Sequence, residues 1–175
     1  MRDWRREYGL AHDNVKLGSL NHLRLTVSDI PRAERFYTPL LGYLGYRLVE
    51  RSPKRIAYAA PTPSGNLQWL IFSLVRPGSA ARHDRYSTGF HHLALNADSR
   101  EQVDEFHRLL IANGAQVLDA PTDYDFEPGY YAVFFSDPDG MKLELVHVPP
   151  QGSLEYWRER EKHGVVETTD LLPGY

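Results

Sequence analysis

Two stretches of the chain, 70 residues apart, repeat the same alternation of apolar and polar positions. In Leu20–Val27 and again in Phe90–Ala97, leucines alternate with more polar residues. A period of two predicts a short strand with one buried face in each stretch. The same offset places His22 over His92. Repeats at a fixed period indicate duplicated structural units, so the chain reads as two copies of one module.

A helical period follows each of these strands. In the second copy Val103, Phe106 and Leu110 fall on one helix face, and Asp98 is expected to cap the helix with Glu101 at the capping-box position. In the first copy the helix is expected to begin near 29–31, with proline in its first turn.

Pro39 is expected to end or kink the first helix, which should therefore be the shorter one. Three more strands are predicted after each helix, the last two joined in the second copy by the turn Asp137–Gly140. Their expected ranges are 46–51, 54–60 and 67–75, then 115–119, 130–136 and 141–148. The predicted fold is α+β: two βαβββ modules in one chain form a curved, cup-like mixed sheet with the helices outside.

The repeat also sets the expected organisation of the chain. It comprises an N-terminal extension over 1–17, a first module over 18–77, a linker over 78–89, a second module over 90–150, and a C-terminal extension over 151–175 with a helix at 153–163.

Composition narrows the possible functions. Hydrophobic residues make up 42% and charged residues 25%, as in ordinary globular proteins. The net charge of -3 and the dispersed basic residues argue against nucleic-acid binding. No apolar run reaches the roughly 20 residues of a membrane span, and the charged N-terminus is unlike a secretory signal, so a cytoplasmic location is expected. The absence of cysteine excludes disulfides, cysteine–zinc sites and thiol catalysis.

Candidate chemistry follows from the duplication. A pseudo-twofold places His22 and His92 at equivalent positions, and alternation turns both toward the polar face of the sheet. Glu144 lies on the same face, between Leu143 and Leu145. A carboxylate in such surroundings is costly to bury without a partner, and a cation would supply one. The sequence therefore predicts one divalent metal ion held by His22, His92 and Glu144.

A tyrosine is expected beside this site. Strand pairing across the tight turn predicts Val133 opposite Glu144, which would place Tyr131 and Phe135 on the site face. Tyr131 would then donate a hydrogen bond or a proton to the substrate. A bulge at the turn would substitute Tyr130.

Other residues are expected around the substrate. Arg24 either holds an anionic substrate or balances the charge of Glu144, while Tyr58, Trp69 and Phe135, with Tyr130, are expected to line an aromatic cleft. The acidic run Asp119, Asp123, Asp125 and Glu127 is expected in a solvated loop. Five other histidines are expected to be structural or exposed: His83, His91, His107, His147 and His163.

Several segments resemble the vicinal oxygen chelate superfamily, which includes glyoxalase I, extradiol dioxygenases, methylmalonyl-CoA epimerase and the bleomycin and fosfomycin resistance proteins. The resemblance covers 18–149. It implies paired βαβββ modules, a divalent ion, and substrates that chelate the ion through neighbouring oxygens, with His22, His92 and Glu144 at the ligand positions. The segments that carry it are Asn21–Asp29, Arg35–Tyr37, Leu41–Gly42, Gly89–Leu95 and Phe134–Leu145.

One departure from glyoxalase I concerns its fourth ligand, a carboxylate late in the first module. Placing Gly65 on Gly140 puts Trp69 there, unless a register shift brings in Gln68. Three protein ligands leave about three octahedral positions open, as in non-haem Fe(II) oxygenases. Fe(II) is therefore favoured, and Mn, Co, Ni or Zn could serve as a Lewis acid.

The expected function is a metal-dependent enzyme that acts on a small molecule, with a dioxygenase-type reaction favoured. The alternatives are a lyase or isomerase of the glyoxalase–epimerase kind, and a metal-free drug-binding resistance protein. A homodimer is one expected assembly, because Leu154 and Trp157 of the C-terminal helix would share a face that docks on the body or on a second subunit.

Overall fold

The computed structural model describes residues 20–62, 65–79, 82–150, 155–156, 158–159 and 162. The expected N-terminal extension over 1–17 and most of the helix expected at 153–163 lie outside the described residues.

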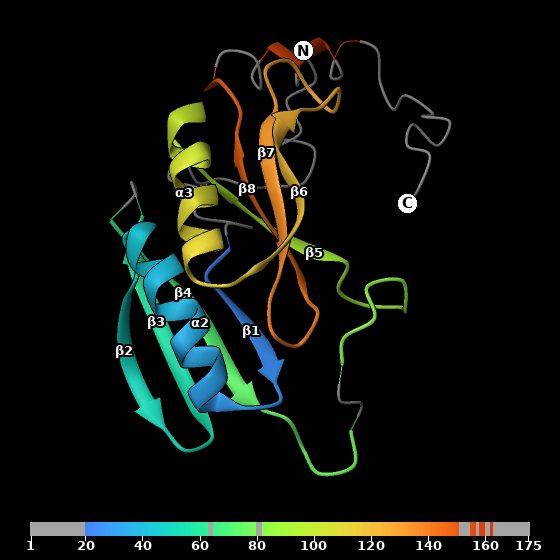
Figure 1. Ribbon diagram of the computed structural model, residues 1–175. Coiled ribbons are helices and arrows are strands. Elements are labelled where there is room, and N and C mark those ends of the chain that lie inside the picture. The colour runs from blue at the N-terminus through green and yellow to red at the C-terminus, as the bar shows by residue number, and fades with distance from the viewer. Residues whose placement is uncertain are drawn as a thin grey trace.

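The first module is a four-stranded mixed sheet in the order β1-β4-β3-β2 (Figure 1). Strands β1 and β4 are parallel, while β3 pairs antiparallel with both β4 and β2. Its elements are β1 (His22–Val27), α2 (Ile30–Tyr43), β2 (Arg47–Ser52), β3 (Arg55–Pro61) and β4 (Leu67–Leu74).

The second module repeats this topology in the order β5-β8-β7-β6. Again the first and last strands, β5 and β8, are parallel and the other pairs antiparallel. Its elements are β5 (His92–Asn96), α3 (Arg100–Ala112), β6 (Gln116–Asp123), β7 (Tyr131–Ser136) and β8 (Lys142–His147). The prediction of two βαβββ modules with mixed sheets is confirmed. Within one chain the sheets are separate, and β1 and β5 are both edge strands.

Helix α2 begins as expected and ends later than expected. Asp29 caps it by accepting a hydrogen bond from the backbone N–H of Arg32 at 2.6 Å. The expectation that Pro39 shortens it is wrong, because the helix continues through Pro39 to Tyr43. Buried side chains on both sides of Pro39, including Leu40 just after it, hold the helix on the sheet, and this packing overrides the lost backbone hydrogen bond.

Helix α3 is capped one residue later than predicted. Ser99, rather than Asp98, is the N-cap, and its hydroxyl accepts from the N–H of Gln102 at 3.3 Å. The side chain of Gln102 reaches back and accepts from the N–H of Asp98 at 2.8 Å. Ser99 and Gln102 therefore have the residue types and the three-residue spacing of a capping box, which can end in glutamine as well as in glutamate.

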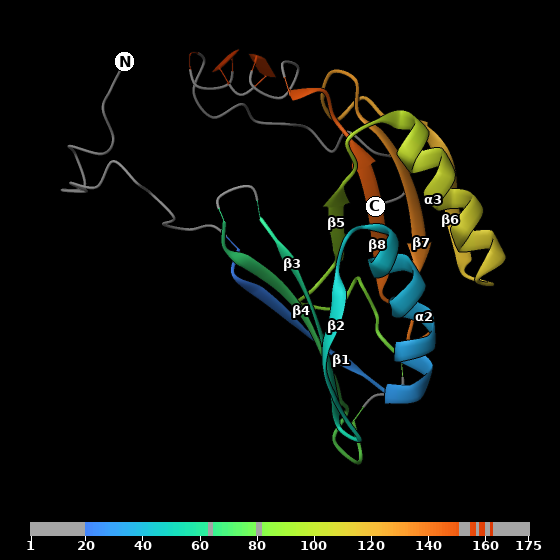
Figure 2. The same ribbon diagram turned by 90° about the vertical axis from the view of Figure 1, so that its left-hand side faces the viewer.

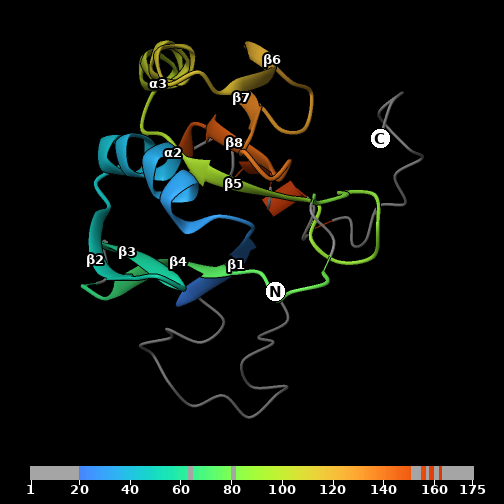
Figure 3. The same ribbon diagram turned by 60° about the horizontal axis from the view of Figure 1, so that its bottom comes forward.

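A single hydrophobic core joins the modules. It contains the inner faces of both sheets and the buried sides of α2 and α3, from Leu25 and Phe72 in the first module to Phe106 and Leu145 in the second. Both helices lie on one side of the molecule (Figure 2), and α2 lies between the first sheet and α3 (Figure 3). The opposite face of the first sheet is therefore turned away from the second module.

Polar contacts also link the modules. Asp139, in the turn before β8, accepts from the backbone N–H and hydroxyl of Ser28 at 2.8 and 2.6 Å and pairs with Arg32 at 2.6 Å. The hydroxyl of Tyr37 donates to Asp137 at 2.9 Å. The pKa values of Tyr37 and Asp137 are both raised, and burial is the largest cause in each case. The turn that precedes the candidate site is therefore anchored to the first module.

Strand β6 is longer than the predicted 115–119 and extends to Asp123, which was expected in a loop. Two irregularities in its pairing with β7 accommodate this extension, including Pro121.

None of the described helices is long and apolar enough to cross a membrane.

Candidate metal centre

The centre of the candidate site is Glu144, whose side chain is only 1% exposed. Its Oε2 atom lies 3.3 Å from Nε2 of His92 but accepts no hydrogen bond from any described residue. A buried carboxylate oxygen without a donor costs free energy unless a cation satisfies it. The 3.3 Å separation suits two ligands of one ion with bonds of about 2.0–2.2 Å. These two residues therefore fit a metal ion by geometry and by donor type.

Tyr130 holds the other oxygen of this carboxylate. Its hydroxyl donates to Oε1 of Glu144 in a short hydrogen bond. Its ring packs with Tyr124, Phe126 and Phe134 in a second, smaller hydrophobic cluster on the outer face of β7 and β8. The aromatic cover explains why Glu144 is buried, and Tyr130 leaves Oε2 as the oxygen available to a ligand.

His91 contacts the other side of the His92 ring. The two Nδ1 atoms are 2.6 Å apart, a hydrogen bond in which one ring donates and the other accepts. With Nδ1 of His92 as the donor, its Nε2 keeps a lone pair on the side of Glu144. Strand alternation predicts that His91 points away from His92 and is structural. His91 precedes the first residue of β5, however, so that alternation does not apply to it.

The predicted pairing across the β7–β8 turn is wrong by one residue. Phe134, not Val133, lies opposite Glu144. Tyr131 and Phe135 consequently face the helices: the Tyr131 hydroxyl donates to Asp104 of α3 at 2.8 Å, and Phe135 belongs to the main core. Tyr130 is the tyrosine beside Glu144, as expected for a pairing shifted by one residue at the turn.

Tyr58 is not on the site face either. It is 1% exposed within the main core, and its hydroxyl bonds to that of Thr38 on α2 at 2.8 Å. Trp69, by contrast, is the Cα partner of His22 in the parallel β1–β4 pair and shares its face. Of the predicted aromatic cleft residues, Trp69 lies beside His22 and Tyr130 beside Glu144, whereas Tyr58 and Phe135 belong to the core.

His22 lies on the outer face of the first sheet. Its Nδ1 is 2.9 Å from Oδ1 of Asn21. Because an amide oxygen only accepts, Nδ1 is the donor in this contact, which leaves Nε2 of the neutral ring as the nitrogen that could bind an ion. Within the described part of the chain, however, no three His, Asp or Glu side chains come close enough to hold an ion. The expectation that His22 faces His92 within one chain is therefore not met, although each of the two is prepared to bind.

The strand register corrects the position of a fourth ligand. Glu144 pairs with Ala94, two residues after His92, and the equivalent residue in the first module is Ile71, paired with Arg24. The Gly65–Gly140 alignment failed because Ile71 lies four residues after the start of β4, whereas Glu144 lies only two residues after the start of β8. Gln68 faces the other way and accepts from the Tyr46 hydroxyl at 3.3 Å. An aliphatic side chain thus occupies the fourth position.

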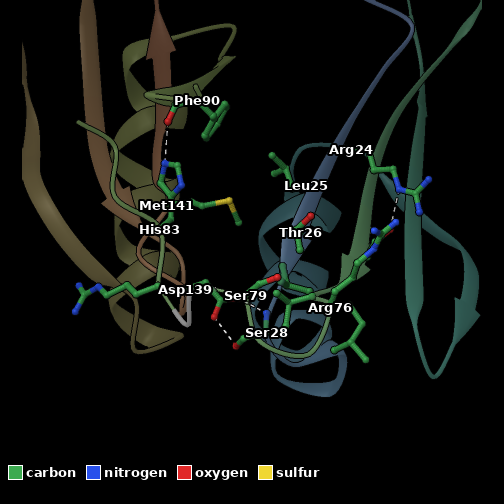
Figure 4. Close-up of a pocket in the computed structure, with 15 residues that line it drawn as sticks. Arg24, Leu25, Thr26, Ser28, Arg76, Ser79, His83, Phe90, Asp139 and Met141 are labelled. Atoms are coloured by element: carbon green, nitrogen blue, oxygen red, sulfur yellow. Dashed lines mark hydrogen bonds between the residues drawn. The ribbon is translucent and has the colours of Figure 1, made fainter. Parts of the chain in front are cut away.

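Arg24 lies two residues after His22 on the same face of β1, and its Nε donates to Ser73 of β4 at 2.8 Å. It borders a cavity of about 760 Å³ between β1, the end of β4 and the segment that leads to β5 (Figure 4). Arg24 forms no ion pair with Glu144, so the charge-balance interpretation has no support in the structure.

Comparison with known proteins agrees with this architecture. Residues 19–145 match the profile of the Glyoxalase/Bleomycin resistance protein/Dioxygenase superfamily. The chain belongs to this superfamily. Membership confirms the resemblance drawn from the histidine-bearing strands and the turn before β8. Among solved structures, a Bacillus halodurans protein is 30% identical with a TM-score of 0.63 over 75% of this chain and 96% of its own. A glyoxalase/bleomycin resistance protein from Albidiferax ferrireducens is also 30% identical, with a TM-score of 0.59 over 74% and 98%.

Members of the superfamily similar in sequence to this chain differ in function. YqjT of Bacillus subtilis is 32% identical over 128 residues, which are 73% of this chain and 97% of that protein. A 2-epi-5-epi-valiolone epimerase from Actinomyces is 29% identical over 81% of this chain and 85% of its own. The metallothiol transferase FosB of Staphylococcus saprophyticus is 29% identical over 83% and 87%. The superfamily is therefore established for this chain, and the names of these relatives show that membership does not specify one reaction.

Proposed function

We propose that this protein is a divalent-metal-dependent enzyme whose ion is held by His92 and Glu144 of one copy and by His22 of a second copy. The observation that carries the proposal is the buried Oε2 of Glu144, which faces His92 and accepts no hydrogen bond from the described residues. Divalent metals are typical of the superfamily, and the names of the epimerase and of the metallothiol transferase support an enzymatic role.

The topology supports a site formed by two copies. Among the described residues of one chain, β1 and β5 are the edge strands of their sheets, and each carries one of the histidines at its first residue. Both sheets direct their inner faces at the common core, so that His22 lies on the opposite, outward face of the first sheet. A twofold axis that sets β1 of one copy beside β5 of the other would complete two equivalent sites, because a closed dimer uses the same surface twice.

Residues that do not bind the ion would orient its ligands and exclude water from the site. Tyr130 orients the Glu144 carboxylate through Oε1, and His91 keeps the His92 ring in the tautomer that binds. The aromatic cluster over β7 and β8 excludes water from Glu144, which strengthens electrostatic interactions there. When bound, the ion would supply Lewis-acid or redox chemistry to a substrate that offers two neighbouring oxygens.

Ile71 favours a dioxygenase-type reaction over proton transfer. An isomerase or lyase needs a base beside the substrate carbon, and an aliphatic side chain stands at the position equivalent to Glu144. Three protein ligands would instead leave room for two substrate oxygens and one further small molecule. Fe(II) is the proposed ion for this reason.

The proposal is tested by metal stoichiometry. Metal-free protein is loaded anaerobically with Fe(II), separated from free ion, and analysed for bound metal. We expect one ion per chain for the wild type and for the control His147→Ala, whose Nδ1 lies 3.2 Å from the carbonyl oxygen of Ala97. His92→Ala should bind none. If the wild-type protein binds no ion, the proposal is wrong and the alternative of a metal-free binding protein is favoured.

A further inference from the structure

Three arginines line the cavity beside the first sheet, and two of them, Arg24 and Arg76, extend from the side of that sheet. Arg24 extends from β1 and Arg76 follows β4, and both border the cavity of about 760 Å³. In Figure 4 the side chain of Arg76 extends toward Arg24. Both residues are exposed, and among the described residues none accepts a hydrogen bond from the terminal N–H groups of either guanidinium.

The positive charge of this pair is not neutralised by the described residues. Neither Arg24 nor Arg76 forms an ion pair with a described carboxylate, and the one bond of Arg24 is to the neutral hydroxyl of Ser73. Asp139 is the acidic residue among those lining the cavity, and it is already occupied by Ser28 and Arg32. Elsewhere on the same sheet the pattern differs, since Arg55 pairs with Glu50 at 3.0 Å.

Fixed geometry distinguishes Arg24 from an ordinary surface arginine. The bond from its Nε to Ser73 Oγ restricts the side chain, so less rotational freedom is lost when an anion binds. Guanidinium groups bind carboxylates and phosphates through paired N–H donors, and two of them at one cavity attract an anion from solution.

The position of the pair relates it to the metal ligand His22. Arg24 lies two residues along the same strand face, a separation of about 6.5–7 Å at the usual strand rise. A small substrate could therefore reach from the ion to the guanidinium groups. Trp69, beside His22 on that face, would border the space between them.

We propose that Arg24 and Arg76 form an oxyanion site that binds a carboxylate or phosphate group of the substrate, at the end remote from the chelating oxygens. This inference rests on the proposed function for its place in the reaction. The existence of the anion site itself depends only on the two arginines.

The test uses metal-free wild-type protein at low ionic strength, titrated with inorganic phosphate and, separately, with acetate. Binding is followed by the Nε–H resonance of Arg24 in the wild type and by calorimetry in all variants. We expect saturable binding of at least one of these anions, weakened about tenfold by Arg24→Gln and by Arg76→Gln. The anion bound more tightly identifies a phosphate or a carboxylate as the preferred group.

Two matched variants complete the design. Arg35→Gln removes the same charge from an exposed position on α2, on the other side of the sheet, and should leave anion binding unchanged. Glu144→Gln should also retain it, because the anion site does not use the ion. Equal affinity in wild type, Arg24→Gln and Arg76→Gln, or no saturable binding of either anion, would overturn the inference. That result would leave metal binding, measured separately, untouched.

Discussion

Glu144 and His92 converge from the neighbouring parallel strands β8 and β5, with Oε2 3.3 Å from Nε2 and no hydrogen bond between them. Each has a second partner that fixes its orientation: Tyr130 for the carboxylate and His91 for the imidazole. A pair held in this way, with the facing atoms unsatisfied, is what a metal site requires before the ion arrives.

His91 is expected to tune the affinity for the ion without binding it. His91→Ala removes the partner of His92 Nδ1 and should weaken metal affinity about 10–100-fold, the usual effect of losing such a contact. Competition against a chelator of known affinity measures the change. His147→Ala is the matched histidine control and should bind as tightly as wild type, whereas unchanged affinity in His91→Ala would show that the His91 contact does not matter.

Tyr130 and Tyr131 provide a test of the strand register. Tyr130→Phe removes the donor to Glu144 Oε1 and should weaken metal affinity about tenfold or more, because a buried charged acceptor loses its hydrogen bond. Tyr131→Phe removes only the bond to Asp104, on the helix side, and should leave metal affinity unchanged. The reverse pattern in the same chelator competition would contradict the observed pairing of Phe134 with Glu144.

Sequence alone predicted the modules, their strands and the three ligand candidates, since these depend on local periodicity and on the repeat. The errors arose where single residues decide the geometry. One residue more or fewer in the β7–β8 turn exchanges the faces of Tyr130 and Tyr131, and two more strand residues between the turn and the ligand position in β4 move the fourth-ligand position from Trp69 to Ile71. Whether the sheets of one chain meet each other depends on the helices between them, which no local pattern encodes.

The contact between Tyr37 and Asp137 should stabilise the join between the modules. Tyr37→Phe leaves a buried carboxylate oxygen without its donor and should lower the free energy of unfolding by about 1–3 kcal/mol near pH 7. Burial already raises the pKa of Asp137, and losing the donor raises it further. Stability from a group with a raised pKa is present at low pH and is lost as pH rises through the folded value.

The difference between wild type and Tyr37→Phe should therefore be small near pH 4 and grow toward pH 7. Urea unfolding at several pH values measures it. Tyr43→Phe, which removes an exposed hydroxyl bonded to Glu105, is the control and should change stability by less than about 0.5 kcal/mol. A difference that shrinks as pH rises would contradict the assigned role of Asp137.

The open coordination positions predict a spectroscopic signature. Protein loaded with Fe(II) should bind nitric oxide, a surrogate for O₂, and give a high-spin Fe–NO signal in electron paramagnetic resonance. A catechol should strengthen the signal, because three protein ligands and two substrate oxygens leave about one of six positions free. Ile71→Glu, which supplies a fourth ligand, should abolish the signal in the presence of catechol. A signal lost in the wild type when catechol is added would instead favour a lyase or isomerase.

The most direct test of the metal site mixes two inactive variants. His22→Ala and Glu144→Gln should each bind no ion alone, because each lacks a ligand in both sites of its homodimer. After the two are unfolded together and refolded, a mixed dimer has one intact site, built from His22 of one copy with His92 and Glu144 of the other. At random pairing, metal analysis should then find about one quarter of the wild-type ion content. An ion content that stays at zero after mixing, with mixed dimers present, would contradict a site shared between two copies.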